Sequence, residues 1–260
     1  MATFLDRILA AHRAVAERDR RPLDALVEAA ADQPPARPFT AALRAEDGLA
    51  VIAEVKRRSP SRGELAPHLV PGVLAKSYAD GGAACLSVLT DAEFFGGSPG
   101  DLEEARAAVE LPVLRKDFTV SERDVCDARL MGADAVLLIA AALSDAELSL
   151  LHQLAVELGL AALVEVHDAV ELGRALAAGA TLVGVNQRDL VSFEVDRNLA
   201  ERLAAQMPPG VAKVAESGVR DARDAERLCA CGYDAILVGE ALVTASDPAE
   251  GVRRLRVPCS

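Results

Sequence analysis

The stretch MGADAVLLI, residues 131–139, joins a glycine to a run of apolar residues, and this pattern recurs along the chain. A glycine there suits the position just after a helix, where the backbone turns left-handed, and the apolar run then suits a buried strand. The glycine returns about every 50 residues, which indicates a repeated unit. The other stretches with this pattern are GGAACLSVL (81–89), AGATLVGVN (178–186) and CGYDAILVG (231–239).

Further apolar runs complete a set of eight predicted strands: AVIAEVK (50–56), LPVLRK (111–116), LAALVEV (160–166) and GVAKVAES (210–217). The intervening segments have helical periodicity, and one of them begins with the capping pattern of Ser144 and Glu147. Eight strands alternating with helices predict an α/β protein of the (β/α)8 barrel type. A doubly wound open sheet is the alternative, but the units are nearly equal and no GxGxxG turn is present.

Residues 1–45 precede the first predicted strand. They contain one amphipathic helical pattern and the proline-rich linker QPPARPF (33–39). A single barrel commonly needs about 250 residues, so a chain of 260 fits one such domain. We therefore expect residues 1–260 to form one barrel domain, with residues 1–45 as a helical extension packed on it.

Composition narrows the possible partners and location. A net charge of −12 argues against nucleic acid and against an anionic membrane surface. The beginning of the chain is charged and has no signal-peptide pattern, and no apolar run is long enough to span a membrane. The five scattered cysteines are odd in number, which predicts reduced thiols and a cytoplasmic location. Cys229 and Cys231 make half of a metal motif at most, and a role in the core is expected for them. We expect a monomer or a weak homo-oligomer.

The basic residues are unevenly distributed, because 24 are arginine and only four are lysine. Lys56, Lys116 and Lys213 lie in or at the end of apolar, β-branched runs. Burial changes the pKa of a lysine, whereas an arginine stays charged, so this placement predicts an anionic site that transfers protons. The alternative is a lysine at a strand edge whose ammonium reaches water, and it stays open, above all for Lys213.

In a barrel the chemistry lies at the carboxyl ends of the strands. Alternation along a strand places Glu54 and Lys56 on one face, and it places Lys213 opposite Glu216, of which we expect Glu216 to point inward. A glutamate among apolar neighbours tends to keep its proton, and a lysine beside other cations tends to lose it. The residues at these ends are Glu54, Lys56, Lys116, Phe118, Glu165, Asn186, Arg188, Glu216, Ser217, Gly218, Gly239 and Glu240.

Two of these turns have the composition of a phosphate site. Gly218 and Gly239 each lead directly into a helical pattern, where free backbone N–H groups bind anions. Together with Lys56 and Arg188 they predict a phosphorylated ligand. Whether the run RRSPSR (57–62) binds this ligand or is merely solvated stays open. No HxH, HExxH or cysteine-rich spacing is present, so no metal ligands are predicted. His167 is expected to cap or precede a helix, and a role in catalysis is the alternative.

Seven ordered motifs resemble indole-3-glycerol-phosphate synthase, and the resemblance covers residues 4–255. The family is a (β/α)8 barrel that works without a cofactor. It converts 1-(2-carboxyphenylamino)-1-deoxyribulose 5-phosphate to indole-3-glycerol phosphate, CO₂ and water in tryptophan biosynthesis. The implied ligand is thus a small phosphorylated molecule derived from anthranilate. The motifs are EVKRRSPSRG (54–63), LTDAEFFGGS (89–98), VLRKDF (113–118), LVEVHD (163–168), VNQRDL (185–190), AESGV (215–219) and LVGEAL (237–242).

The resemblance also implies roles for single residues. Lys116 corresponds to the general acid that protonates the substrate carbonyl, and Glu165 to the carboxylate that handles protons during ring closure and dehydration. Lys56 contacts the anionic substrate and acts as acid in the later step, while Glu54 orients the lysines. The further pocket residues implied are Ser59, Phe95, Phe118, Asn186, Arg188, Glu216 and Ser217, with Gly218, Gly239 and Glu240 beside the phosphate.

Two positions depart from the family pattern, Gln187 where asparagine is usual and Arg58 where a small residue is common. Three alternatives stay open. Phosphoribosylanthranilate isomerase is another phosphate-binding barrel, but it uses a cysteine on its first strand, where this chain has Glu54 and Lys56. A Schiff-base aldolase would use Lys116 as a nucleophile. A non-catalytic barrel would need neither acid nor base.

Overall fold

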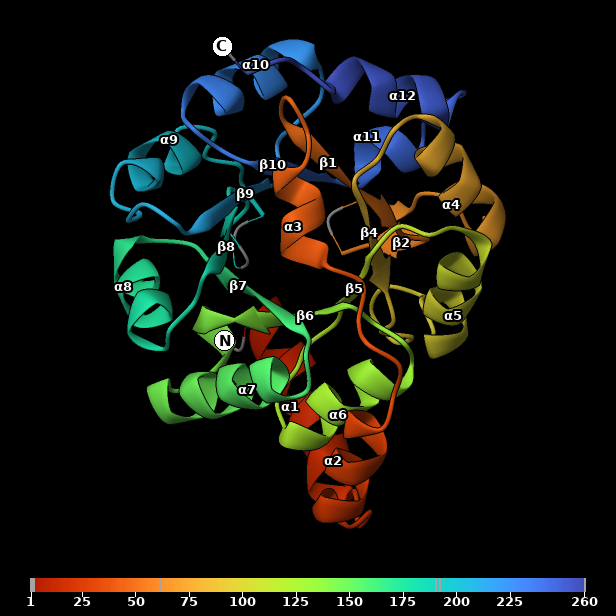
Figure 1. The fold of residues 1–260 in the computed structure, drawn as a ribbon, viewed down its shortest axis with the longest axis vertical. Helices are drawn as coiled ribbons and strands as arrows, with labels where there is room; N and C mark the ends of the chain where they lie inside the picture. Colours follow the sequence, from red (N-terminus) through yellow and green to blue (C-terminus); the bar gives the residue numbers. More distant parts are fainter. Residues whose placement is uncertain (1–2, 61, 190, 192, 260) are drawn as a thin grey trace.

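Eight parallel strands close into a barrel in the computed structural model, which describes residues 3–60, 62–189, 191 and 193–259. Around the barrel the strands pair in the order β1, β10, β9, β8, β7, β6, β5, β4 and back to β1. The predicted (β/α)8 fold is confirmed (Figure 1). The barrel strands are β1 (Ala50–Val55), β4 (Cys85–Leu89), β5 (Val113–Lys116), β6 (Ala135–Ile139), β7 (Ala161–Val166), β8 (Leu182–Asn186), β9 (Ala212–Glu216) and β10 (Ala235–Val238).

Helices surround the barrel (Figure 1). Helix α7 begins with the predicted capping box, in which the Ser144 side chain accepts from the backbone of Glu147 and the Glu147 carboxylate accepts from the backbone of Ser144. Among the described residues, the helical elements after β1 are α4 (Pro71–Asp80), α5 (Pro99–Ala108), α6 (Glu122–Leu130), the 3-10 turn η1 (Ala140–Ala142), α7 (Asp145–Glu157), α8 (Ala169–Ala177), α9 (Leu199–Ala204), α10 (Ala222–Ala230), α11 (Glu240–Val243) and α12 (Pro248–Leu255).

The recurring glycines have the conformation that the repeat predicts. Gly82, Gly132, Gly179 and Gly232 follow α4, α6, α8 and α10, with φ angles of 86°, 84°, 90° and 78°. A side chain at such an angle would clash with its own backbone, so glycine allows each helix to turn directly into the next strand.

Three helices precede the barrel where one was expected: α1 (Phe4–Arg18), α2 (Leu23–Ala31) and α3 (Phe39–Arg44). Helix α3 packs at the amino ends of the strands, where the carbonyl of Phe39 accepts from the thiol of Cys85 at the start of β4. Figure 1 shows α3 in front of the barrel and α1 on its far side. The two helices therefore cover opposite ends of the barrel.

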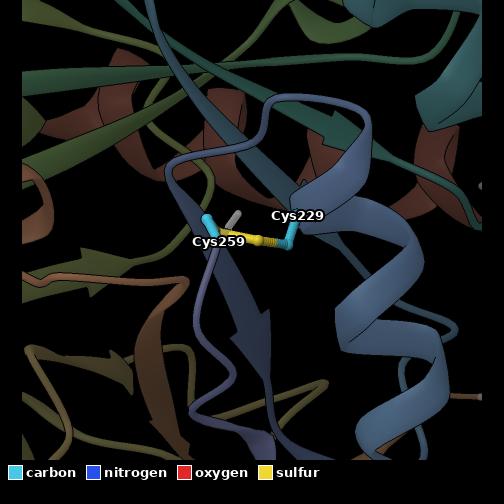
Figure 2. The surroundings of a disulfide bond; sticks show 2 residues. All are labelled: Cys229 and Cys259. Atoms are coloured by element: carbon cyan, nitrogen blue, oxygen red, sulfur yellow. A yellow bond between two sulfur atoms is a disulfide. The ribbon is translucent and has the colours of Figure 1, made fainter.

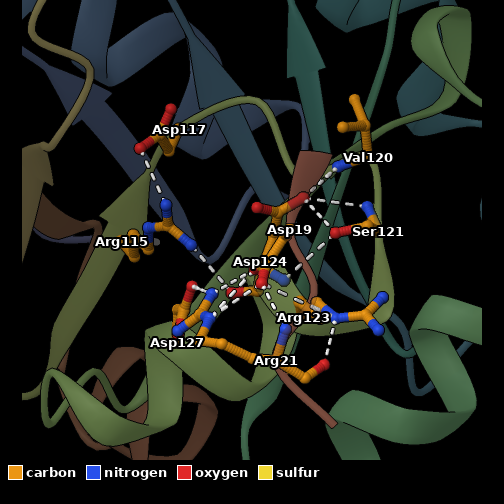
Figure 3. A network of polar contacts seen from close by, with 9 residues as sticks. All are labelled: Asp19, Arg21, Arg115, Asp117, Val120, Ser121, Arg123, Asp124 and Asp127. Carbon is orange, nitrogen blue, oxygen red and sulfur yellow. Dashed lines mark hydrogen bonds and ion pairs between the residues drawn. The ribbon is translucent and has the colours of Figure 1, made fainter. Parts of the chain in front are cut away.

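The segment between α1 and α2 is tied to α6 by a polar network (Figure 3). The guanidinium of Arg21 donates to both carboxylate oxygens of Asp127 at 2.8 Å, and the backbone carbonyl of Arg21 accepts from Arg123 at 2.9 Å. The N-cap of α6 belongs to the same region, because Ser121 and Asp124 form a capping box. These contacts hold the beginning of the chain against the barrel.

A short antiparallel hairpin, β2 (Arg58–Ser59) with β3 (Gly63–Glu64), follows β1. The two arginines left open by the sequence have partners in the protein. Arg57 pairs with Asp101 of α5, and Arg58 donates to the backbone carbonyls of Ala92 and Glu93.

Ser61 and Leu190, which belong to two of the quoted motifs, lie outside the described residues. In the described part of the chain, no helix is long and apolar enough to cross a membrane.

The expectation of reduced thiols is wrong for two of the five cysteines. Cys229 of α10 and Cys259 form a disulfide, with their Cα atoms 5.6 Å apart (Figure 2). The C-terminal segment returns to the amino end of the barrel, where Pro258 pairs with Gly48 just before β1, and this return brings Cys259 to α10. The sequence separation of 30 residues does not reveal this proximity, because it depends on the path of the chain around the barrel.

The disulfide gives a simple chemical prediction. Denatured without reductant, the protein should expose three reactive thiols, because Cys85, Cys126 and Cys231 are free, and all five should react after reduction. Counting thiols with a chromogenic disulfide reagent measures this directly. Five reactive thiols before reduction would contradict the bridge.

Candidate active site

A cavity of about 490 Å³ opens at the carboxyl ends of the strands. Of the three lysines in apolar runs, Lys56 and Lys116 line this cavity and Lys213 does not. The predicted residues that meet there are Glu54, Lys56, Ser59, Phe95, Lys116, Phe118, Glu165, Asn186, Arg188, Glu216, Ser217, Gly218, Gly239 and Glu240.

Lys116 lies at the centre of the charged part of the cavity. Its Nζ donates to Glu165 Oε2 at 2.9 Å and to Glu216 Oε2 at 2.8 Å. The three residues come from β5, β7 and β9, and both glutamates are only 2% exposed. Lys213 instead donates from Nζ to the carbonyl of Ala204 at 3.1 Å, so the predicted inward direction of Glu216 is confirmed.

The ionisation of Lys116 and Glu165 is the reverse of what their local sequence suggests. Burial disfavours the charge on Lys116, but the carboxylates of Glu165, Glu216 and Glu54 outweigh burial and raise the pKa of the ammonium. Burial likewise favours a neutral Glu165, but Lys116 and His167 outweigh it and lower the pKa of this carboxyl. A protonated lysine therefore faces an ionised glutamate.

Glu216 differs from Glu165. Burial and the nearby charge of Glu165 raise the pKa of Glu216 to about 7, although Lys116 acts in the opposite direction. Its Oε1 is buried and has no hydrogen-bond partner among the described residues. The two carboxyl groups on Lys116 are thus unequal, and Glu216 accepts a proton more readily.

The first strand adds a second ion pair. Glu54 and Lys56 point in one direction, as predicted, and Lys56 Nζ lies 2.5 Å from Glu54 Oε1. Glu54 is 4% exposed, and its backbone carbonyl accepts from the hydroxyl of Tyr78 at 3.1 Å. This pair places a second ammonium at the cavity wall.

Two glycines make room for these side chains. A Cβ atom at Gly184 would overlap Oε1 of Glu216, and one at Gly239 would overlap Oε1 of Glu54 and crowd Nζ of Lys56. Both glycines are thus required by the close approach of a buried side chain, which their sequence context does not reveal.

Polar contacts link the end of β8 to β7 and to the turn after β9. Asn186 Nδ2 donates to Glu165 Oε1 at 3.1 Å, while Asn186 Oδ1 accepts from the backbone of Arg188 at 3.1 Å. Gln187 is buried, and its Nε2 donates to the carbonyl of Ser217 at 2.8 Å. Ser217 has a φ of 64°, an angle uncommon for a residue with a side chain. Gln187, one of the two departures from the family pattern, thus supports the turn at Ser217.

The turns after β9 and β10 keep their glycines at the cavity. Gly218 has a φ of 77° and allows the chain to turn sharply beside the pocket. Glu240 follows Gly239 at the start of α11, and its side chain pairs with Arg62 at 3.1 Å. Both side chains of this ion pair are exposed, so it is partly screened by solvent.

Aromatic and apolar side chains form another part of the cavity lining. The rings of Phe95 and Phe118 lie 6.1 Å apart between their centroids. Phe4, Leu5 and Ile8 of α1 also line the cavity. These three residues were not predicted, because an apolar stripe on an amphipathic helix looks the same whether it packs on a core or covers a pocket.

Helix α1 is held in this place by charged contacts. His12 Nε2 lies 3.1 Å from Asp91 Oδ2 and 3.9 Å from Asp117 Oδ1, and Arg13 pairs with Glu147 of α7 at 2.7 Å. His12, Asp91 and Asp117 lie within the 4.8 Å spacing of a cation site. However, both oxygens of each carboxylate already accept from donors of the protein. Internal donors therefore account for this cluster.

The fold and site define a class of protein, namely α/β barrels that carry out acid–base chemistry at the carboxyl end of the barrel. A likeness to solved structures supports the fold. Thiamine phosphate pyrophosphorylase from Pyrococcus furiosus has a TM-score of 0.61 at 16% identity, covering 81% of this chain and 94% of its own. N-acetylmannosamine-6-phosphate 2-epimerase from Clostridium perfringens has a TM-score of 0.62 at 15% identity, covering 80% and 93%.

Within this class the chain belongs to the indole-3-glycerol phosphate synthase family, whose model matches residues 5–255. It is 54% identical to indole-3-glycerol phosphate synthase 2 of Streptomyces coelicolor, over 88% of this chain and 89% of the relative. It is 53% identical to indole-3-glycerol phosphate synthase of Leifsonia xyli subsp. xyli, over 94% and 93%. The function expected from the seven motifs, a carboxy-lyase of tryptophan biosynthesis, is confirmed.

The close approach at Gly184 predicts a specific loss. We expect Gly184→Ala to cost about 1–3 kcal/mol of unfolding free energy and to reduce turnover, because the new methyl group displaces the carboxylate of Glu216. Gly173→Ala is the control, since Gly173 lies exposed within α8 with open space around its Cβ position. Chemical denaturation and steady-state kinetics compare the two variants. Equal effects of both would contradict the requirement for space at Gly184.

The contacts of His12 predict a pH-dependent stability. Burial disfavours the charged imidazole, but Asp91 and Asp117 outweigh it and raise the pKa of His12 above its ordinary 6.5. The stabilisation is therefore fully present below pH 6.5 and is lost as pH rises through the raised value. We expect the Tm difference between wild type and His12→Gln to be largest near pH 6 and to shrink at alkaline pH. His68→Gln, at an exposed position, is the control, and a pH-independent difference for His12→Gln would refute the contact.

Proposed function

We propose that Lys116 is the general acid and Glu165 the proton-accepting carboxylate of the indole-3-glycerol phosphate synthase reaction. In this reaction the ring carbon that bears the carboxylate attacks the ribulose carbonyl, CO₂ leaves, and water is then eliminated. The observation that carries the proposal is the position of Lys116 between two buried carboxylates at the cavity. The substrate is the small phosphorylated compound derived from anthranilate.

Ring closure needs an acid at the carbonyl oxygen. The raised pKa of Lys116 keeps the ammonium protonated at neutral pH, so a proton is available when the carbonyl oxygen becomes an alkoxide. Ring closure breaks the aromaticity of the benzene ring, and loss of CO₂ restores it without any further proton acceptor. Lys116 therefore supplies the one proton that this stage requires.

Dehydration needs a base and a second acid. Glu165 is ionised and accepts the proton that is lost as the double bond of the indole forms. Lys56 donates to the departing hydroxyl, and Glu54, 2.5 Å from Lys56 Nζ, orients this ammonium. The two lysines on different strands thus serve two successive steps, and Glu165 is placed within reach of Lys116 by the barrel register.

The substrate's two ends meet different parts of the cavity. The backbone at Gly218, Gly239 and Glu240 holds the phosphate, with Lys56 and Arg188 supplying positive charge. Phe95 and Phe118 flank the aryl ring. Ser59, Asn186, Glu216 and Ser217 contact the carboxylate and hydroxyl groups. A cytoplasmic location and a monomeric or weakly associated state remain predictions.

Replacement of Lys116 tests the proposal. Lys116→Met should lower turnover at least 10²-fold, because it removes the general acid. Lys116→Arg keeps a positive charge but provides no transferable proton, so it should be as inactive. Lys76→Met, at an exposed position on α4, is the control and should retain wild-type activity. Indole fluorescence measures product formation from the carboxyphenylamino substrate.

Circular dichroism should show that the Lys116 variants remain folded. Turnover near the wild-type rate in a folded Lys116→Met protein would remove Lys116 from the reaction. Trapping of a reduced adduct on Lys116 by borohydride would instead indicate a Schiff-base mechanism.

A further inference from the structure

Lys116 does not distinguish its two carboxylate partners. Its Nζ contacts Glu165 and Glu216 at 2.9 and 2.8 Å, and both glutamates are 2% exposed. The ammonium favours the ionised form of both, but burial and the repulsion between the two carboxylates favour a proton on one of them. The reaction proposed above needs the ionised one to be Glu165, and the reason must lie beyond Lys116.

The remaining oxygens of the two carboxylates have different surroundings. Glu165 Oε1 accepts from Asn186 Nδ2 at 3.1 Å and lies 3.4 Å from His167 Nε2. Glu216 Oε1 is buried without a hydrogen-bond partner among the described residues. A carboxylate with an additional donor and an additional cation stays ionised, and one that lacks both takes up the proton.

His167 is oriented for this contact by its own helix. Its Nδ1 lies 3.1 Å from Glu171 Oε2, and its backbone N–H donates to the same oxygen at 2.8 Å. Glu171 is in turn held on α8 by the N-cap Asp168, which accepts from the backbone of Glu171 at 2.8 Å. With Nδ1 facing Glu171, Nε2 faces Glu165 at ion-pair distance, although Nε2 has no hydrogen-bond partner among the described residues. A protonated imidazole therefore acts on Glu165 through its charge.

We propose that His167 is a positioning residue that, with Asn186, keeps Glu165 ionised and directs the shared proton to Glu216. This inference rests on the proposed role of Glu165. His167 does not line the cavity, so it acts through Glu165 and not on the substrate. His167 precedes the N-cap Asp168 of α8, as the sequence predicts.

The charges around this group agree with the proposal. His167 is flanked by Glu165 and Glu171, which outweigh the effect of burial and raise the pKa of the imidazole to about 10. Lys116 also acts on Glu165, and Glu54 acts on Lys116 from β1. At neutral pH His167 is therefore a cation beside Glu165, and Lys116 remains protonated well above neutrality.

Removal of His167 should make turnover depend on pH in a new way. In His167→Leu the proton moves onto Glu165, so we expect kcat to fall about tenfold near pH 6.5, with KM within about twofold of wild type. Above the upper titration of the pair the proton is lost, and kcat should return to within about twofold of wild type near pH 9. His167→Gln keeps a donor without the charge and should show a smaller loss. His68→Gln, at an exposed position, should match wild type throughout.

Two further variants separate the possible outcomes. Glu171→Gln leaves His167 in place but removes its second partner, so it should shift the profile in the same direction by less, even if His167→Leu folds poorly. Glu165→Gln should be inactive at every pH. One outcome would overturn the inference about His167: pH profiles of kcat for the folded His167 variants and Glu171→Gln that superimpose on the profile of wild type. If Glu165→Gln is inactive in that case, the role of Glu165 stands. If Glu165→Gln turns over normally, the role of Glu165 falls, and the inference falls with it.

Discussion

The contact of one ammonium with two carboxylates inside the barrel is the constraint on which the rest of the site depends. Lys116, Glu165 and Glu216 are nearly removed from water, and a buried charge is tolerated only when it is paired. Removing one partner of a buried pair typically costs about 3–5 kcal/mol. The three strands that carry these residues must therefore keep their relative heights, since a shift would separate the charges.

The pairing register of the strands sets the positions of these residues along the barrel axis. Lys116 pairs with Leu89, Glu165 with Ile139 and Glu216 with Asn186, so each charged residue is level with the end of a neighbouring strand. Gly184 then leaves the space that Glu216 fills. Parallel pairing thus determines which side chains can meet, and the small residues between them determine how closely.

The repeated helix–strand unit and the faces of the strands could be predicted from the order of residues along the chain, whereas α2, α3 and the short hairpin could not. The glycines at 82, 132, 179 and 232 mark real helix–strand junctions, and alternation correctly separates Lys213 from Glu216. Contacts between residues far apart in the sequence could not be predicted in this way. The apolar neighbours of Glu165 suggested a neutral acid, but Lys116 lies 49 positions away in sequence and 2.9 Å away in the protein. The partnership of Cys229 with Cys259 and the place of α1 depend on the same kind of proximity.

Phe4 and Pro258 lie at opposite ends of the barrel, and this has a practical consequence for attaching a tag. Helix α1 begins at Phe4, which is itself part of the cavity wall. Pro258, by contrast, pairs with Gly48 at the far end, below the first strand. A purification tag or fusion partner joined ahead of Phe4 would emerge beside the ligand's entrance, whereas one joined after Cys259 would point away from it. Attachment at the carboxyl terminus is therefore the choice that leaves the entrance clear.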